Sequence, residues 1–156
     1  MRNPEFVKAA FSAIATRYVA TNHVLSMGVD LLWRQRVVQL VSEWKPERLL
    51  DLATGTGDLA LAILRAMPEI RLTGSDFCQP MLDVAAERGL TNLVCADAMN
   101  LPFPSASYDA VTVAFGLRNM ASYPDALKEM GRMLRPGGHL LILDFSLPEN
   151  LLKRPY

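Results

Sequence analysis

The 156-residue chain has few cysteines, few histidines and no excess of either charge. Its two cysteines, Cys78 and Cys95, are too few for a disulfide framework, which favours a reducing compartment and predicts a cytoplasmic protein. The two histidines, His23 and His139, lie far in sequence from both cysteines, so we expect no metal site. The 16 basic residues balance the 16 acidic ones, which gives no electrostatic reason to expect a nucleic-acid partner.

Long hydrophobic runs are also absent. No apolar stretch approaches the ~18 residues that a membrane-spanning helix needs, and the residues after Met1 do not lead into a signal-type apolar segment. Hydrophobic residues nevertheless make up 51% of the chain and charged residues 21%, a composition that excludes disorder. The length suits one hydrophobic core, so we expect a single domain over residues 1–156.

Hydrophobic periodicity divides the chain into a helical segment, residues 1–45, and an alternation of strands and helices, residues 46–156. Strands are expected at five short apolar runs: 49–53, 70–75, 93–96, 110–115 and 140–145. Strands that alternate with helices over short connections form parallel sheets with right-handed crossovers. Runs that are apolar throughout indicate that helices cover both faces of the sheet. The sequence therefore predicts an α/β, doubly wound, Rossmann-like sheet.

The helix before the last expected strand has a recognisable start and end. Ser122 with Asp125 is typical of a capping box. The run Pro136-Gly137-Gly138 should end the helix, because proline and glycine are poor helix formers. The buried stripe of this helix is expected at three apolar positions: Leu127, Met130 and Leu134.

A glycine-rich turn follows the first expected strand. Gly55, Thr56 and Gly57 occupy it, and Ala60 holds the third small position of a G-x-G-x-x-A pattern. Glycine lets backbone approach a ligand closely, because a Cβ would intrude. About 20 residues later Asp76 ends the second strand, where nucleotide-binding sheets hold a ribose diol. Alternatively, the glycines form only a tight strand-to-helix turn, and Asp76 only caps a helix or lies in a solvated turn. The spacing between the glycines and Asp76 makes these alternatives less favourable.

Carboxylates near this turn bear on which nucleotide binds. Asp58 begins the next helix, where it would repel a diphosphate and satisfy the helix dipole. Asp51, Asp76 and Asp97 stand at the ends of three successive strands. S-adenosyl-L-methionine, with its ammonium group, sulfonium and ribose, suits this set better than NAD. We expect Asp76 to bind the ribose and Asp97 the adenine amine, the alternative for Asp97 being a turn former and for Asp58 a plain first-turn residue.

Three short segments share a pattern with one enzyme family. They read Phe-Ser-Ala-Ile-Ala-Thr-Arg-Tyr at 11–18, Asp-Leu-Ala-Thr-Gly-Thr-Gly-Asp at 51–58 and, most specifically, Ala-Phe-Gly-Leu-Arg-Asn at 114–119. With these residues the chain resembles the ubiquinone/menaquinone-biosynthesis C-methyltransferases over most of its length. The resemblance implies methyl transfer from S-adenosylmethionine to the ring of a prenylated quinol, either demethylmenaquinol or the ubiquinone-pathway benzoquinol.

The resemblance also implies functional residues. Thr56, Asp76, Asp97 and Ala98 would contact the cofactor. At Ala114, where family members often carry serine, one side-chain contact would be missing. With the turn and strand-end residues included, the expected cofactor-binding set is Asp51, Gly55, Thr56, Gly57, Asp76, Asp97, Ala98 and Ala114.

Candidate catalytic residues follow from the chemistry of a phenol ring. A quinol carbon becomes a better nucleophile once the neighbouring hydroxyl, with a pKa near ~10, loses its proton. Arg118 would stabilise the resulting oxyanion, or serve as a structural arginine that binds loop carbonyls. Asn119 would contact the substrate or form a turn. His23 would act as the general base, although a lone histidine is more often a packing residue.

The two ends of the chain raise expectations of their own. Residues 1–45 are expected to close over the cofactor as a helical lid that lines a path for the prenyl tail, or to form ordinary core packing. Family members continue past the fifth strand, so the strand at 140–145 would be an apolar edge, covered by the missing strands or by another subunit.

Two further points concern membrane contact and the alternative functions. A prenylated substrate predicts peripheral membrane contact, although no basic amphipathic face is present. Besides a quinol methyltransferase, three functions remain open: a truncated cofactor-binding domain without turnover, another small-molecule methyltransferase, and a nicotinamide-dependent oxidoreductase.

Overall fold

The computed structural model describes residues 29–144, with side chains from residue 31 onward. Most of the predicted lid, and His23 with it, lies outside the described residues. In chain order the elements are α2 (Val29–Trp44), β1 (Arg48–Leu52), α3 (Asp58–Ala66), β2 (Arg71–Asp76), α4 (Gln79–Glu87), β3 (Leu93–Cys95), β4 (Tyr108–Ala114), the 3-10 helix η1 (Leu117–Asn119), α5 (Tyr123–Met133) and β5 (Leu134–Leu143). The strand positions are confirmed to within two residues at either end, except for the start of β5.

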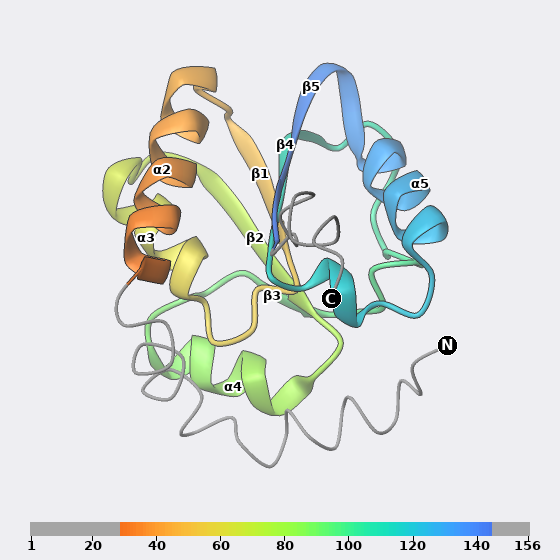
Figure 1. Cartoon of the computed structure of the whole chain (residues 1–156), viewed down its shortest axis with the longest axis horizontal. Helices are drawn as coiled ribbons and strands as arrows, with labels where there is room; N and C mark the ends of the chain where they lie inside the picture. The colour runs from red at the N-terminus through yellow and green to blue at the C-terminus, as the bar shows by residue number, and fades with distance from the viewer. Residues whose placement is uncertain (1–28, 145–156) are drawn as a thin grey trace, which may run out of the picture.

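All five strands run parallel in one sheet, in the order β3-β2-β1-β4-β5 (Figure 1). The chain moves outward from β1 through β2 to β3, and then crosses back to β4 on the other side of β1. The direction of winding therefore reverses between β1 and β4. Ligands of such sheets bind at the carboxyl ends of the strands, beside this reversal. The predicted doubly wound α/β sheet is confirmed.

Helices cover both faces of the sheet (Figure 1). Leu49 of β1 packs in a core that α2, α3 and α4 share, whereas Leu50, the next residue, packs in the core beneath α5. Both leucines are fully buried. This two-sided burial explains why the strands read as continuous apolar runs in the sequence.

Helix α5 confirms the predicted start and the burial of Met130, but the rest of its buried stripe differs from the prediction. Ser122 is the N-cap, and its Oγ accepts the N–H of Asp125 at 3.4 Å. The side chains that face the sheet are Ala126, Met130 and Met133. Leu127, which we expected to be buried, is 39% exposed. The helical spacing was correct, but the buried face is rotated by about one residue position, so that Ala126 and Met133 take the places expected for Leu127 and Leu134.

Strand β5 begins earlier than predicted. It starts at Leu134, directly after α5, so Pro136-Gly137-Gly138 lies within the strand and does not separate the helix from it. Leu134 pairs with Tyr108 and His139 pairs with Ala110, so the residues between them bulge out of register. Such a bulge accommodates both a proline and a glycine with a φ of +81°, the value at Gly137.

The outer side of β5 pairs with no other strand within residues 29–144. Leu140 and Ile142 on this strand are 37% and 41% exposed. The predicted apolar edge is thus confirmed for the described part of the chain.

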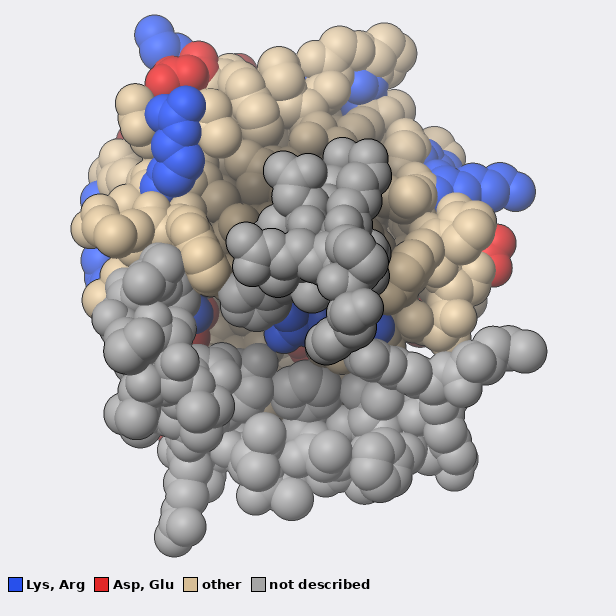
Figure 2. All heavy atoms as spheres, viewed as in Figure 1, with Lys and Arg blue, Asp and Glu red and all other residues tan. Residues whose placement is uncertain are grey.

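On the face drawn in Figure 2, basic side chains are separated by tan surface and do not gather into one field. No helix of residues 29–144 combines the length and the apolar character that crossing a bilayer requires.

Candidate functional site

The glycine-rich turn leaves β1 and enters α3 with two glycines in the left-handed region. The φ angles are +55° at Gly55 and +81° at Gly57. A Cβ on Gly57 would lie 2.4 Å from Leu90 Cδ1, and one on Gly55 would lie 3.4 Å from Met81 Cε. We predicted that these glycines let a ligand approach the backbone, and that role stays a prediction. The close approach of Leu90 also gives Gly57 a packing role, and the backbone conformation itself favours glycine at both positions.

Asp51 lies buried beneath this turn. Its Oδ2 accepts the hydroxyl of Thr54 at 2.7 Å, and its Oδ1 accepts the hydroxyl of Thr112 on β4 at 2.6 Å. Burial raises the pKa of Asp51 to about 6, against the lowering effect of both hydroxyls and with a further increase from the charge of Asp76. Because both carboxylate oxygens are bound, Asp51 joins the turn to β4 across the reversal of the sheet.

Asp76 ends β2 and connects two loops. Its Oδ2 accepts the N–H of Gly55 at 2.9 Å, and its Oδ1 accepts the N–H of Cys78 at 2.9 Å. The residue is only 8% exposed, and burial raises the pKa of its carboxyl, while these N–H donors lower it. A carboxylate offers about four acceptor positions, so Asp76 retains capacity for ligand hydroxyls.

Asp58, at the start of α3, is balanced by two arginines. Its Oδ1 lies 2.7 Å from Arg88 Nη1, and its Oδ2 lies 3.6 Å from Arg34 Nη2 on α2. Arg88 also donates to the carbonyl oxygen of Thr56 at 2.7 Å. Asp58 was predicted to repel a diphosphate, but these two arginines compensate its charge within the protein, so Asp58 gives no reason to exclude a diphosphate.

The N–H groups of the turn give a different reason to disfavour a diphosphate. Gly55 N–H donates to Asp76, and Gly57 N–H donates to the carbonyl oxygen of Thr54 at 2.9 Å. Phosphate-binding turns direct such N–H groups at the ligand. Here two of them are used inside the protein, which suits a ligand without phosphates.

The remaining predicted cofactor contacts lie at the same end of the sheet. Asp97 follows β3, is exposed, and accepts the N–H of Met99 at 2.9 Å through Oδ1. This contact confirms its role as a turn former, and its binding of adenine stays a prediction. Ala98 is half-buried beside it, Thr56 is buried in the glycine-rich turn, and Ala114 is half-buried at the end of β4.

Two non-glycine residues with left-handed backbone flank the reversal of the sheet. Ala53 follows β1 with a φ of +50°, and Phe115 follows β4 with a φ of +57°. A Cβ on Gly116 would lie 2.3 Å from the Cβ of Ala53, so the two turns touch and only glycine fits between them. Each such residue costs about 1–3 kcal/mol, and strain of this kind gathers at functional sites.

Arg118 and Asn119 lie in η1, just after the turn at Phe115. The N–H and Nη1 of Arg118 each lie 3.3 Å from Asp144, on Oδ2 and Oδ1 respectively. The guanidinium carbon of Arg118 lies 5.9 Å from the centre of the Phe115 ring. Asn119 N–H donates to the carbonyl oxygen of Gly116 at 3.0 Å. Arg118 thus has structural contacts, among them the ion pair with Asp144, and its catalytic role stays a prediction.

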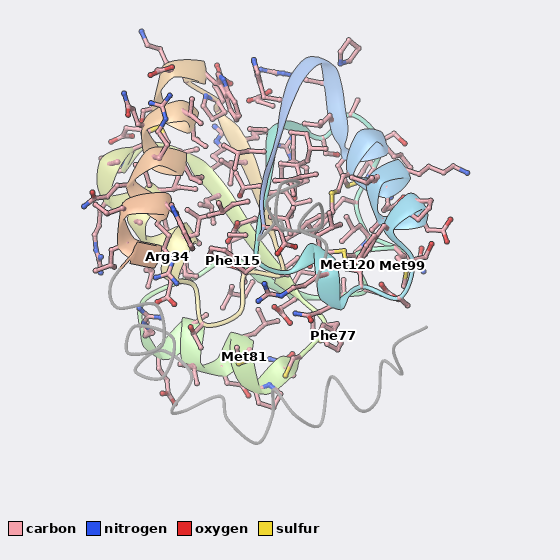
Figure 3. All side chains as sticks on the ribbon, viewed as in Figure 1. Arg34, Phe77, Met81, Met99, Phe115 and Met120 are labelled. Atoms are coloured by element: carbon pink, nitrogen blue, oxygen red, sulfur yellow. The ribbon has the colours of Figure 1, made fainter. Side chains whose placement is uncertain are left out.

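Several large side chains around the carboxyl ends of the strands were not among the predicted site residues. Figure 3 labels six of them: Arg34, Phe77, Met81, Met99, Phe115 and Met120. They come from α2, α4 and the loops after β2, β3, β4 and η1. An apolar surrounding with few polar groups is typical of a small-molecule site. Phe77 and Phe115 follow parallel strands directly, a signal that the sequence did offer.

Comparison with known proteins agrees with this geometry. The sequence model of the ubiE/COQ5 methyltransferase family matches residues 1–156. The chain is 51% identical to a demethylmenaquinone methyltransferase of Thermus thermophilus, over 88% of this chain and 65% of that protein. It is 39% identical to the ubiquinone/menaquinone biosynthesis C-methyltransferase UbiE of Geotalea daltonii, over 95% of this chain and 66% of that protein. The chain thus spans slightly less than two thirds of the length of these relatives.

A solved structure supports the assignment of the fold. The putative methyltransferase in complex with the Haloferax volcanii Trm112 activator aligns with a TM-score of 0.66 and 25% identity, over 82% of this chain and 57% of that one. The predicted Rossmann-like methyltransferase sheet is therefore confirmed.

Proposed function

The chain belongs to the ubiE/COQ5 methyltransferase family, and we propose that it transfers the methyl group of S-adenosylmethionine to a ring carbon of a prenylated quinol. Demethylmenaquinol is the preferred acceptor, because the relative at 51% identity is named a demethylmenaquinone methyltransferase. The benzoquinol of the ubiquinone pathway is the second candidate, since the relative at 39% identity is named for both pathways.

The polar groups at the strand ends support S-adenosylmethionine as the cofactor. Asp76 has acceptor capacity for the ribose hydroxyls at the end of β2, and Asp97 offers a carboxylate oxygen to the adenine amine beyond β3. When bound, the cofactor supplies a methyl group on a sulfonium. The remaining contacts that we propose are Gly55, Thr56, Gly57, Ala98 and Ala114, with Asp51 acting through the turn that it holds.

Arg118 is the residue that we propose for substrate activation. Its guanidinium carries a fixed positive charge beside the end of β4, so it can stabilise the phenolate oxygen of the acceptor while Asp144 fixes its orientation. When bound, S-adenosylmethionine would supply its methyl group to the ring carbon, and the proton of that carbon would pass to a base so that the ring regains its aromaticity. Asn119 lies beside Arg118 and is proposed to contact the acceptor. His23, proposed as the base, lies outside the described residues.

The observation that supports this proposal most strongly is the contact between the turn at Ala53 and the turn at Phe115 and Gly116. Gly116 belongs to the segment 114–119, the most family-specific part of the sequence, and Ala53 belongs to the segment that resembles the cofactor loop. These two residues touch, since a Cβ on Gly116 would lie 2.3 Å from the Cβ of Ala53. Segment 114–119, which we propose for the acceptor, therefore contacts segment 51–58, which we propose for the cofactor, and this contact supports the alignment of the two reactants.

Calorimetric titration of the 156-residue chain with S-adenosylhomocysteine, and with NAD as the control, tests the cofactor. Micromolar binding of S-adenosylhomocysteine alone is the expected result. Binding of NAD alone would overturn the methyltransferase assignment. Incubation with S-adenosylmethionine and a reduced naphthoquinone should then add one methyl group to the ring, measured by mass spectrometry. Binding without transfer would leave this chain with a cofactor-binding role alone.

A prenylated acceptor has consequences for where the chain acts. We propose that it works in the cytoplasm and contacts the membrane surface peripherally to reach its substrate. Flotation with vesicles that contain a prenylated naphthoquinone tests this contact, and equal recovery with quinone-free vesicles would contradict a role of the substrate in it.

We also propose that a second copy of the chain covers the outer edge of β5, where Leu140 and Ile142 are exposed. Light scattering should then give the mass of a dimer, and Ile142→Lys should convert it to a monomer. A monomer in both cases would contradict this assembly.

A further inference from the structure

Strand β4 ends in an aromatic residue whose side chain departs from the alternation of the strand. Val113 packs in the core beneath α5, and Ala114 packs against the core that α2 shares. Continued alternation would direct Phe115 to the α5 side. The left-handed φ of +57° instead brings its ring to α2, where the ring centre lies 5.9 Å from that of Trp33.

The surrounding contacts hold this unusual conformation in place. Phe115 N–H donates to the carbonyl oxygen of Leu143 at 2.7 Å. Gly116, the next residue, packs directly against Ala53. A bulky residue with positive φ is a genuine outlier, and such strain persists only where neighbouring contacts determine it. The conformation therefore positions the Phe115 ring specifically.

The ring lies beside the groups that methyl transfer would use. The Arg118 guanidinium carbon is 5.9 Å from the ring centre of Phe115. Figure 3 places Phe115 among the side chains that surround the carboxyl ends of the strands. Trp33 adds a second ring, tilted by 47° to the first. An aromatic surface and a cation thus lie together at the reversal of the sheet.

We propose that Phe115, supported by Trp33, is the surface on which the acceptor ring stacks, and that it selects planar aromatic acceptors over saturated ones. This inference rests on the proposed function and adds a specificity-determining residue to it. Arg118 would fix the position of the acceptor oxygen, and Phe115 would fix the plane of the ring. Both are needed to present one ring carbon to the methyl group, because reactivity depends on orientation as well as distance.

The two tryptophans of the chain allow a direct test. Both lie on α2, Trp33 near the site and Trp44 at the other end of the helix, stacked on His139 at 4.5 Å. Trp44→Phe leaves Trp33 as the emitter, and Trp33→Phe leaves Trp44. The probe is dimethylnaphthoquinone with S-adenosylhomocysteine present. Its two reactive ring carbons are methylated, so it does not alkylate the exposed Cys95.

Saturable quenching of Trp33 emission, with Trp44 quenched only as much as free tryptophan, is the expected result. A saturated cyclic diketone should quench neither. Equal quenching of both tryptophans, or no saturable quenching of Trp33, would overturn the proposal.

A ring-removal variant made in the Trp44→Phe chain sharpens the test. Phe115→Leu keeps an apolar side chain and the same backbone strain but removes the ring, and should raise the Kd of the quinone roughly 3- to 10-fold. Phe115→Tyr should restore the affinity. S-adenosylhomocysteine should bind equally well to all of these chains, which verifies folding. An unchanged quinone Kd in Phe115→Leu would overturn the inference, whereas failure of S-adenosylhomocysteine to bind the parent chain would instead count against the proposed function.

Discussion

Buried carboxylates stand at both ends of the sheet, and the two ends balance them differently. At the amino end, Asp109 Oδ2 accepts the N–H groups of Glu47 and Arg48, both at 2.8 Å. Arg135 on β5 forms an ion pair with the same carboxylate. The negative charge of Asp109 thus has both N–H donors and a cation, and the residue joins the starts of β1, β4 and β5.

At the carboxyl end, Asp51 and Asp76 have no cation at ion-pair distance within the part of the chain that the structure describes. Hydroxyl groups bind the first and backbone N–H groups bind the second. Burial raises both pKa values, against the lowering effect of these neutral donors. We therefore expect the amino end to serve stability and the carboxyl end to bind the ligand.

We expect the largest effect from a substitution at the amino end, Asp109→Ala, which should lower stability and leave binding unchanged. Asp109→Ala removes the acceptor for two backbone N–H groups and the partner of Arg135. We expect the free energy of unfolding to fall by about 3 kcal/mol, as for the loss of hydrogen bonds to a charged group. Urea denaturation measures this change. The affinity for S-adenosylhomocysteine should be unaffected, and a large loss of affinity would contradict the division between the two ends.

Asp76→Ala is the reciprocal change at the carboxyl end. We expect the affinity for S-adenosylhomocysteine to fall roughly 100-fold, because the ribose loses a charged acceptor and Gly55 loses the group that orients its N–H. Calorimetry at one temperature for Asp76→Ala and Asp109→Ala provides the comparison. Equal affinities in the two variants would remove Asp76 from the binding site.

The raised pKa of Asp51 should make the free energy of unfolding depend on pH. Its pKa is raised from 3.8 to about 6, so between these values the folded chain retains a proton that the unfolded chain has released. Stability should therefore fall as the pH rises from about 4 to about 6 and level off above, with a total on the order of 2–3 kcal/mol from this group. Asp51→Asn should remove that share of the slope, and Asp76 should contribute in the same direction.

Chemical denaturation of the parent chain and of Asp51→Asn across this pH range checks the sign. A stability that rises with pH in this window by the same amount in both chains would show that Asp51 is not the group responsible.

The smallest effect is expected at Asp97, which is exposed and lies beyond β3. Asp97→Asn keeps an acceptor oxygen for the N–H of Met99 and removes only the charge. Affinity for S-adenosylhomocysteine should fall roughly 3- to 10-fold, with no measurable change in the unfolding free energy. An unchanged affinity would leave Asp97 with its turn-forming role alone.

Most of the fold could be predicted because burial leaves a periodic pattern in the sequence. Strand runs such as 110–115 are apolar throughout, and their alternation with helices determines a parallel sheet. The stripe of α5 was partly misplaced because the neighbouring residues Ala126 and Leu127 are both apolar, and the periodicity alone does not decide which of them faces the sheet. The start of β5 was missed because a bulge tolerates proline and glycine.

The site was predictable only in part, for a related reason. Asp51, Asp76 and Asp97 could be found because each ends or follows a parallel strand. The partners of Asp58 could not, because Arg34 and Arg88 come from other helices with no fixed spacing. The direction of the Phe115 side chain depends on one left-handed φ angle, which local sequence does not reveal for a residue other than glycine.

The position of β1 at the centre of the sheet has a consequence for how the chain folds. The Thr112–Asp51 hydrogen bond that joins β1 to β4 spans 61 residues, so closing it requires most of the described chain to be present. During synthesis β1, β2 and β3 emerge first, and one edge of β1 stays unpaired until β4 has been synthesised. Contacts of such long range form slowly. The carboxyl-end site, which lies across that junction, is therefore completed late in folding, after the glycine-rich turn has met its acceptor on β2.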